Sequence, residues 1–149
     1  MLNMTDNSGF SLLRNSALAI DKIGAKIIAH ESQSSEAELL IIEISGKEFY
    51  LCDVKSRSLI SLFVEIGFEE NAAKDECCRL SNNLNKNSYQ AKFSFDSEDM
   101  KLRAMVSLPY EYVETEMYEF LMADGLRSLV EHLSLVQDED DELLISETW

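Results

Sequence analysis

Apolar residues recur along this chain with two different periods, and the points where the period changes divide it into elements. The first set recurs every three or four residues, which is the spacing of one helical face. It consists of Phe10, Leu13, Ala17 and Ile20. We expect Ser8 to cap the start of this helix and Gly24 to supply a left-handed residue at its end.

Strand patterns follow this helix. Four strands are expected, over residues 26–30, 39–44, 47–54 and 58–64. The first ends at a polar stretch, and the last continues to about Gly67. Ser45 and Gly46 separate the second and third strands by two residues, a connection typical of a β-hairpin.

The helical period then returns and predicts an amphipathic helix over residues 69–86. Its apolar face consists of Ala73, Cys77, Leu80 and Leu84. Strict alternation of apolar and polar residues follows on both sides of a turn at residues 97–99. The apolar positions are Tyr89, Ala91, Phe93 and Phe95 in the first arm and Leu102, Ala104, Val106 and Leu108 in the second. Alternation in both arms predicts an antiparallel hairpin with one buried face.

The last element is a helix over residues 111–136. Its apolar face consists of Met122, Leu126, Leu129, Leu133 and Val136. The order α-β-β-β-β-α-β-β-α predicts an α+β fold in which helices pack on one face of an antiparallel sheet. Because the chain contains one proline and five glycines and no linker-like stretch, we expect residues 1–137 to form a single domain.

Charge is concentrated toward the end of the chain. The formal net charge is −15 over 149 residues, and residues 101–149, with twelve acids and three bases, contribute −9 of it. Such a surface repels phosphates, so nucleic acid is an unfavourable partner. The run of acids at residues 138–142 must stay solvated, and we interpret residues 138–149 as an acidic tail. A frayed terminus is the favoured interpretation, although the apolar residues 143–149, which include Trp149, leave docking as the alternative.

Several features indicate the cytoplasm. No apolar stretch approaches the length of a membrane span, and the N-terminus lacks the basic start and apolar region of a secretory signal. Cys52, Cys77 and Cys78 are an odd number with two adjacent members, which implies no disulfide framework.

The candidate chemical groups do not form a recognisable motif. Cys77 and Cys78 point about 100° apart on a helix, and His30 and His132 are remote in sequence, so we expect no metal site and no catalytic residue. Cys77 fits a core position, His30 a surface position, and His132 a helix C-terminus. The acids Asp96, Glu98 and Asp99 lack the ligand count and glycine placement of a calcium loop, so they fit turn chemistry. No glycine-rich phosphate loop is present, and we expect no cofactor.

Residues 80–108 carry a family resemblance. A helix closes with Ser81-Asn82-Asn83-Leu84-Asn85 and is followed by Ala91-Lys92, the acidic turn at residues 96–99 and the strand at residues 102–108. This arrangement resembles the YbjN-type family of bacterial sensory transduction regulators, with Ser81 in place of alanine and Leu84 in place of isoleucine. The resemblance covers about residues 38–136. It implies the fold shared with type III secretion chaperones, and it carries no catalytic residue to transfer.

Two functions follow from this resemblance. The first is a small, acidic, non-enzymatic binding protein of the YbjN type, regulatory or stress-linked, acting through protein–protein contacts. The alternative is a type III secretion chaperone that binds the extended N-terminal segment of an effector. For such a chaperone the acidic charge favours a basic partner segment. The edge strands of an antiparallel sheet favour a homodimer.

Overall fold

The computed structural model of the chain describes residues 3–4, 10–34, 37–88 and 90–147. Its helices are α1 (Leu12–Lys22), α2 (Lys74–Asn87) and α3 (Thr115–Glu139), with the short 3-10 helix η1 (Lys55–Arg57). Its strands are β1 (Asn3–Met4), β2 (Lys26–Ser34), β3 (Ala37–Ile44), β4 (Lys47–Val54), β5 (Leu59–Gly67), β6 (Lys92–Asp96), β7 (Lys101–Pro109) and β8 (Val113–Glu114).

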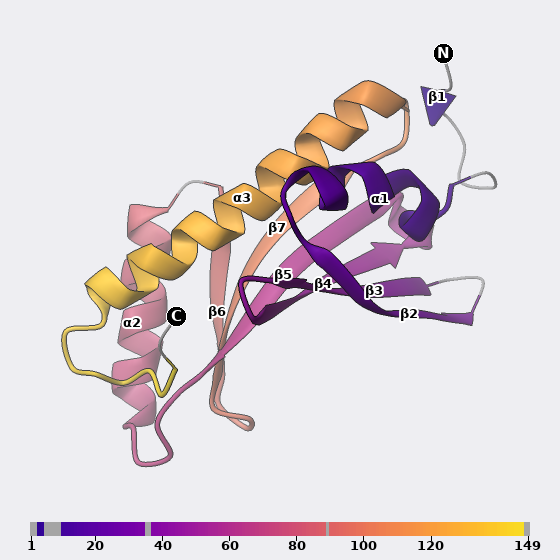
Figure 1. Cartoon of the computed structure of the whole chain (residues 1–149). Helices are drawn as coiled ribbons and strands as arrows, with labels where there is room; N and C mark the ends of the chain where they lie inside the picture. Colours follow the sequence, from indigo (N-terminus) through magenta and orange to yellow (C-terminus); the bar gives the residue numbers. More distant parts are fainter. Residues whose placement is uncertain (1–2, 5–9, 35–36, 89, 148–149) are drawn as a thin grey trace. The chain divides into compact units, whose positions relative to one another are not determined.

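Six strands form one antiparallel sheet in the order β2-β3-β4-β5-β7-β6 (Figure 1). β1 pairs with β8 in a separate two-stranded sheet. The predicted α+β class and the order of the main elements are confirmed. Both predicted hairpins are present, as β3–β4 and as β6–β7. Ser45 and Gly46 both adopt positive φ, at 51° and 83°, which is the backbone that a tight two-residue hairpin turn requires.

The chain divides into two compact units. Unit 1 comprises residues 1–62 and 107–127, and unit 2 comprises residues 63–106 and 128–149. In unit 1, α1 packs against β2 and β3, whose inward side chains include the fully buried Leu40 and Ile42. In unit 2, α2 packs against β6 and buries Cys77, Leu80 and Leu84. The division into a single domain over residues 1–137 and an acidic tail stays a prediction.

Of the predicted apolar face of the first helix, Phe10 and Ile20 are buried as expected, and the prediction is wrong at Leu13 and Ala17. The structure buries Leu12, Ser16, Ala19 and Ile20, whereas Ala17 is exposed and Leu13 only half-buried. The helix begins after Ser11, whose hydroxyl accepts a hydrogen bond from the N–H of Arg14 and acts as the N-cap. Phe10 therefore lies outside the helix, and including it shifted the predicted phase. Ser8, the predicted cap, lies outside the described residues.

The other two helices begin later than predicted because the preceding residues pair as strands. α2 begins at Lys74 rather than at residue 69, because Phe68 and Glu69 pair with the C-terminal segment. α3 begins at Thr115 rather than at residue 111, because Val113 and Glu114 form β8. The predicted apolar face of α3 is confirmed, since all five of its residues are buried: Met122, Leu126, Leu129, Leu133 and Val136.

The chain beyond α3 is docked in unit 2. Ile145 forms an antiparallel bridge with Phe68, and Leu144 is only 8% exposed. The frayed-terminus interpretation is therefore wrong for residues 140–147, and the docked alternative holds there. Thr148 and Trp149 lie outside the described residues.

Candidate functional site

Exposed apolar side chains gather where β8 meets α3 in unit 1. Met117 and Phe120 are 53% and 62% exposed, and their spacing of three residues places them on one face of the helix. Together with Glu114 and Glu116 they line a shallow pocket, and we call these four residues the α3 patch. Tyr112, which is 77% exposed, precedes β8 in the sequence. Exposed apolar groups clustered within a polar rim are typical of a binding surface.

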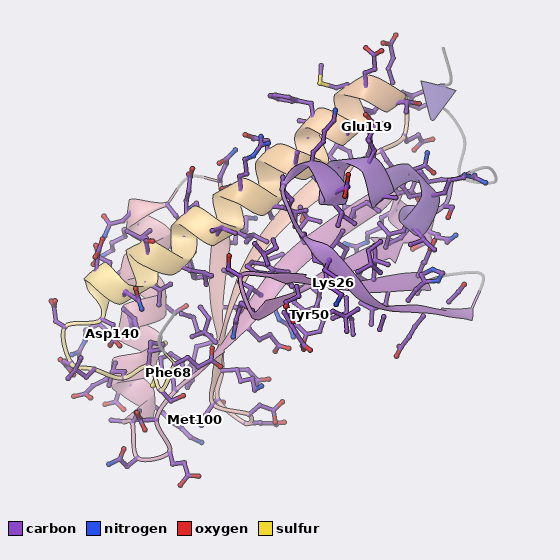
Figure 2. All side chains as sticks on the ribbon, viewed as in Figure 1. Lys26, Tyr50, Phe68, Met100, Glu119 and Asp140 are labelled. Carbon is purple, nitrogen blue, oxygen red and sulfur yellow. The ribbon has the colours of Figure 1, made fainter. Side chains whose placement is uncertain are left out.

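The surroundings of the α3 patch are strongly acidic. Residues 104–126 contain no lysine or arginine. Five acids lie in the same stretch: Glu111, Glu114, Glu116, Glu119 and Asp124 (Figure 2 labels Glu119). Part of this charge is favourable to the helix itself, because carboxylates near a helix N-terminus oppose the helix dipole. The remainder gives the patch a negative potential that attracts basic side chains.

A buried aromatic cluster fixes the patch from below. Tyr118, fully buried between the exposed Met117 and Phe120 in the sequence, hydrogen-bonds through its hydroxyl to Ser16 of α1 at 2.7 Å. The ring of Phe10 stacks on Tyr110 with a centroid distance of 3.9 Å, and meets Tyr118 edge-on at 5.5 Å. These contacts join the start of α3 to α1 and fix the position of the helix turn that exposes Met117 and Phe120.

Tyr110 connects this aromatic cluster to a buried carboxyl group. Its hydroxyl donates a hydrogen bond to Asp53 Oδ1 at 2.9 Å, and its backbone N–H donates to the carbonyl oxygen of Ser58 at 3.1 Å. Asp53 is fully buried, and burial raises its pKa above the ordinary range for aspartate. Its Oδ2 accepts no hydrogen bond, and Lys55 Nζ lies 3.9 Å from it.

A second buried carboxylate caps helix α1. Glu38 of β3 accepts hydrogen bonds from the backbone N–H groups of Leu12 and Leu13 at 3.0 and 3.2 Å, and it contacts His30 Nε2 at 2.7 Å. Burial alone would raise the pKa of Glu38, but the hydrogen bonds from Leu12 and His30 outweigh it, and the pKa is lowered. The Glu38 carboxylate thus accepts hydrogen bonds from N–H groups of the first turn of α1 that have no partner within the helix.

The residues singled out from the sequence do not come together as a site. His30 is exposed, as predicted, and pairs with Glu38, whereas His132 Nδ1 lies 2.6 Å from the carbonyl oxygen of Ser128 on its own helix. The three cysteines are free, with Cys52 half-buried, Cys77 buried and Cys78 exposed. Across the described ranges, no group of three or more His, Cys, Asp and Glu side chains is arranged to hold a metal ion.

The acidic hairpin turn is explained by local hydrogen bonding. Asp96 Oδ1 accepts from the backbone N–H groups of Glu98 and Asp99 at 3.0 and 3.3 Å. This is the side-chain turn that aspartate favours at such positions, and it confirms the interpretation of these acids as turn residues.

Sequence reasoning missed the functional interest of Met117 and the buried network of Glu38 and Asp53. The missed signal for the patch was two apolar residues on the wrong face of the last helix, within a stretch without basic residues. For Glu38 and Asp53 the signal was an acid at an inward position of an otherwise apolar strand pattern.

Comparison with known proteins places the fold. No protein-family profile and no curated protein matches the sequence. Among solved structures, the chain is similar to E. coli YbjN, a proposed transcription regulator, with a TM-score of 0.61 and 15% identity over 92% of this chain and 97% of that one. It is also similar to a chain of the ExsC–ExsE complex, with a TM-score of 0.61 and 17% identity over 99% of this chain and 100% of that one. An uncharacterized protein from Methanothermobacter thermautotrophicus gives a TM-score of 0.57 and 7% identity over 85% and 96%.

The chain therefore has the YbjN-type, type III secretion chaperone-like fold that its sequence resemblance implied. At these identities the likeness establishes the fold, and function must be argued from the surface. None of the helices in the described part of the chain has the length and apolar character that a membrane crossing requires.

Proposed function

We propose that this chain is a non-enzymatic binding protein that holds a basic, apolar segment of a protein partner on the α3 patch. The observation that carries the proposal is the exposure of Met117 and Phe120 within a stretch that has five acids and no base. Apolar side chains of the partner would remove the two exposed groups from water, and its lysines or arginines would face Glu114 and Glu116.

The biological role that fits this activity is regulatory or stress-linked, of the YbjN type, in the cytoplasm. The similarity in fold to YbjN supports this role. A second role, that of a type III secretion chaperone for an extended effector segment, is supported by the similarity to a chain of the ExsC–ExsE complex over its whole length. Binding to an unfolded effector segment, but not to folded regulatory proteins, would favour the second role.

A pair of labelled peptides tests the binding proposal directly. Both carry the same alternating leucines, separated by lysine in one peptide and by glutamate in the other. Fluorescence anisotropy with the full chain should show binding of the lysine peptide and none of the glutamate peptide. The double variant Met117→Ala, Phe120→Ala should lose at least about tenfold in affinity, because central apolar contacts dominate such interfaces.

A matched control separates the patch from general charge attraction. Leu18 on α1 is 51% exposed, close to the value for Met117, so Leu18→Ala removes a comparable apolar group elsewhere. This variant should bind the lysine peptide as the unaltered chain does. Equal losses in Leu18→Ala and in the double variant, or no loss in either, would show that the α3 patch is not the site.

Association of two copies is a separate proposal. β2 is an edge strand of the six-stranded sheet, and it exposes Ile27 and Ile28 to 36% and 45%. Pairing of such edges covers both backbone groups and apolar side chains. Light scattering at tens of micromolar should give the mass of a dimer, and a monomer mass would contradict this proposal.

A further inference from the structure

The segment that follows α3 occupies a strand position in unit 2. An antiparallel bridge joins Ile145 to Phe68, just beyond the end of β5. Beside the bridge, the backbone N–H of Glu69 donates to the carbonyl oxygen of Leu144 at 2.8 Å. On its other side, Phe68 donates its own N–H to the carbonyl oxygen of Met100 at 3.0 Å, and the two residues lie close together in Figure 2. Residues 67–69 thus accept an added strand along one edge.

Gly67 allows this strand to approach closely. Its carbonyl oxygen accepts both the backbone N–H and the hydroxyl of Ser146, each at 2.9 Å. A Cβ atom on Gly67 would lie 3.1 Å from Ser146 Oγ, which is tighter than ordinary van der Waals contact. A side chain at Gly67 would therefore require the Ser146 hydroxyl to shift.

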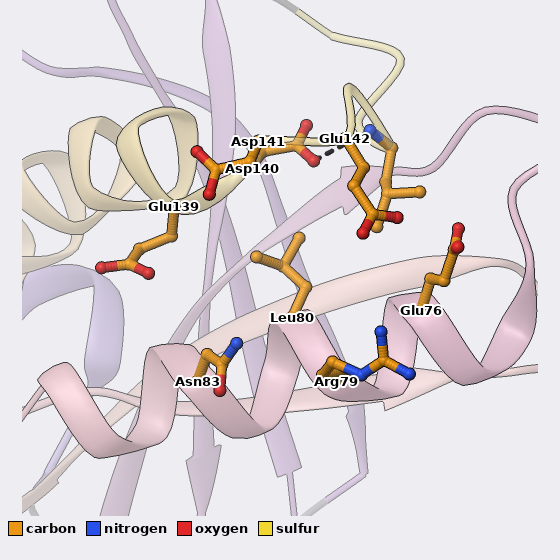
Figure 3. A pocket seen from close by; sticks show the side chains of 9 residues that line it. Glu76, Arg79, Leu80, Asn83, Glu139, Asp140, Asp141 and Glu142 are labelled. Carbon is orange, nitrogen blue, oxygen red and sulfur yellow. Dashed lines mark hydrogen bonds between the residues drawn. The ribbon is translucent and has the colours of Figure 1, made fainter.

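Leu144 supplies the apolar contact of the segment. Together with Leu80 of α2 it lines a pocket of about 90 Å³ (Figure 3). The Asp140 carboxylate accepts the N–H groups of Leu144 and Ile145 at 2.8 and 2.9 Å, which turns the chain back at the end of α3. Leu143, by contrast, is 80% exposed. One apolar side chain is thus placed against α2 and its neighbour is not.

The same segment is poorly matched at Glu142. Figure 3 shows the Glu142 side chain extending toward α2, where Glu76 lies. A hydrogen bond between the two carboxyl groups, together with their like charge, raises the pKa of Glu76. Two other charged groups of α2 act on Glu76: Asp75, which has the same charge, and Arg79, which has the opposite charge. The chain's own segment fits at Leu144 and Ser146, and at Glu142 it places a second carboxyl group beside Glu76.

We propose that this groove, formed by residues 67–69 and α2, binds an extended segment of a protein partner, and that residues 142–146 occupy it as a displaceable substitute. The favoured occupant has lysine or arginine at the position of Glu142, a leucine-sized side chain at that of Leu144, and at that of Ser146 a serine, whose hydroxyl donates to the Gly67 carbonyl oxygen. A basic residue would face Glu76 with opposite charge, whereas the chain's own Glu142 has the same charge as Glu76. This site lies in unit 2 and does not depend on the α3 patch.

Occupancy in cis is a competition that can be measured. A tethered segment competes at an effective concentration on the order of millimolar, so a free peptide binds well only when the tethered one is released. The variant Leu144→Asp places a charge at the apolar position and releases the segment while leaving the groove intact. A labelled peptide of residues 140–147 carrying Glu142→Lys should bind this full-length variant at least about tenfold more tightly than the unaltered chain.

Four further variants are expected to change peptide binding in different directions. Adding Gly67→Ala to Leu144→Asp should weaken peptide binding, because the Cβ lies 3.1 Å from the Ser146 hydroxyl oxygen and forces it to shift. Glu142→Lys in the chain itself should tighten cis docking and weaken peptide binding, whereas Asp141→Lys, which makes the same charge change at the adjacent exposed residue, should do so less. Leu143→Asp, at an 80% exposed position, should leave peptide binding as in the unaltered chain. Circular dichroism confirms that each variant is folded.

Hydrogen exchange supplies a second measurement that needs no peptide. The Ser146 amide, which is bonded to Gly67, should be protected in the unaltered chain and should lose protection in Leu144→Asp. Equal peptide affinity in the unaltered chain and Leu144→Asp, or an affinity that Gly67→Ala leaves unchanged, would overturn the proposal. A dimer that is lost in Leu144→Asp would show instead that the groove takes the segment of a second copy, and a foreign partner would then be the wrong occupant.

Discussion

Apolar side chains are exposed near the beginning of α3 and buried beyond its end. At its beginning, in unit 1, Met117 and Phe120 stay exposed among acids. Beyond its end, in unit 2, the chain turns back and buries Leu144 in a groove that is itself bordered by acids. A partner can bind directly to the exposed α3 patch. At the groove, a partner segment must first displace the chain's own residues 142–146. We therefore expect the two proposed sites to require different partner affinities, with the higher affinity needed at the groove.

The largest expected effect contrasts the two faces of α3. Tyr118→Ala removes a fully buried ring that hydrogen-bonds to Ser16, and it should lower the free energy of unfolding by about 3–5 kcal/mol. Phe120→Ala, two residues away but 62% exposed, should change it by no more than about 0.5 kcal/mol. Urea unfolding measures both. A comparable loss in Phe120→Ala would mean that this ring serves stability and is not kept for a partner.

The next effect concerns Glu38, which caps α1, the helix that Tyr118 joins to the α3 patch. Because the folded-state pKa of Glu38 is lowered, its ionisation stabilises the fold above the ordinary glutamate pKa, and this contribution is lost as the pH falls through the folded-state value. Glu38→Gln should therefore cost about 1–2 kcal/mol at neutral pH, from weakened capping of α1, and little in acid. Urea midpoints at neutral and acidic pH give the comparison.

Asp53 is the matched opposite case. Its folded-state pKa is raised, so ionisation of Asp53 costs stability as the pH rises above the ordinary aspartate range, and the cost is absent in acid. Asp53→Asn keeps an oxygen acceptor for the Tyr110 hydroxyl and removes the buried charge. It should be neutral or stabilising at neutral pH, and a clear loss of stability there would show that the Asp53 charge and Lys55 form a favourable pair.

The smallest expected effect concerns the acidic rim. Glu114→Gln and Glu116→Gln should each weaken binding of the lysine peptide about twofold to fivefold, because exposed charge pairs contribute little. The losses should shrink as salt is added. Glu131→Gln, an exposed acid on the same helix in unit 2, is the control and should change affinity less. Equal effects at all three positions would indicate attraction by net charge alone.

The sequence predicted those parts of the fold that depend on repeated local patterns. The hairpin around Ser45 and Gly46 follows from two strands and a two-residue turn, and the buried face of α3 follows from its heptad-like spacing. The predicted phase of the first helix included Phe10, which precedes the helix, and passed over Ser16, whose burial depends on a hydrogen bond to Tyr118, 102 positions away. Local periodicity carries no information about such a partner.

Neither the α3 patch nor the groove in unit 2 was predicted from the sequence, for related reasons. Met117 and Phe120 became notable only when Tyr118, between them, was found to face the core. The acidic run at residues 138–142 suggested a solvated tail, yet Asp140 uses its carboxylate to fold the chain back onto Phe68. A run of acids indicates side chains that stay in water. It does not indicate whether the apolar residues after the run pack against the rest of the protein.

The most direct test of binding at the α3 patch uses the methionine methyl groups as position markers. In an NMR titration of the full chain with the lysine peptide, the methyl resonance of Met117 should shift progressively until the site is saturated. The methyl of Met122, which is fully buried on the same helix, and those of Met100 and Met105 in unit 2 should stay in place. Saturable binding of the peptide with an unchanged Met117 resonance would contradict the account.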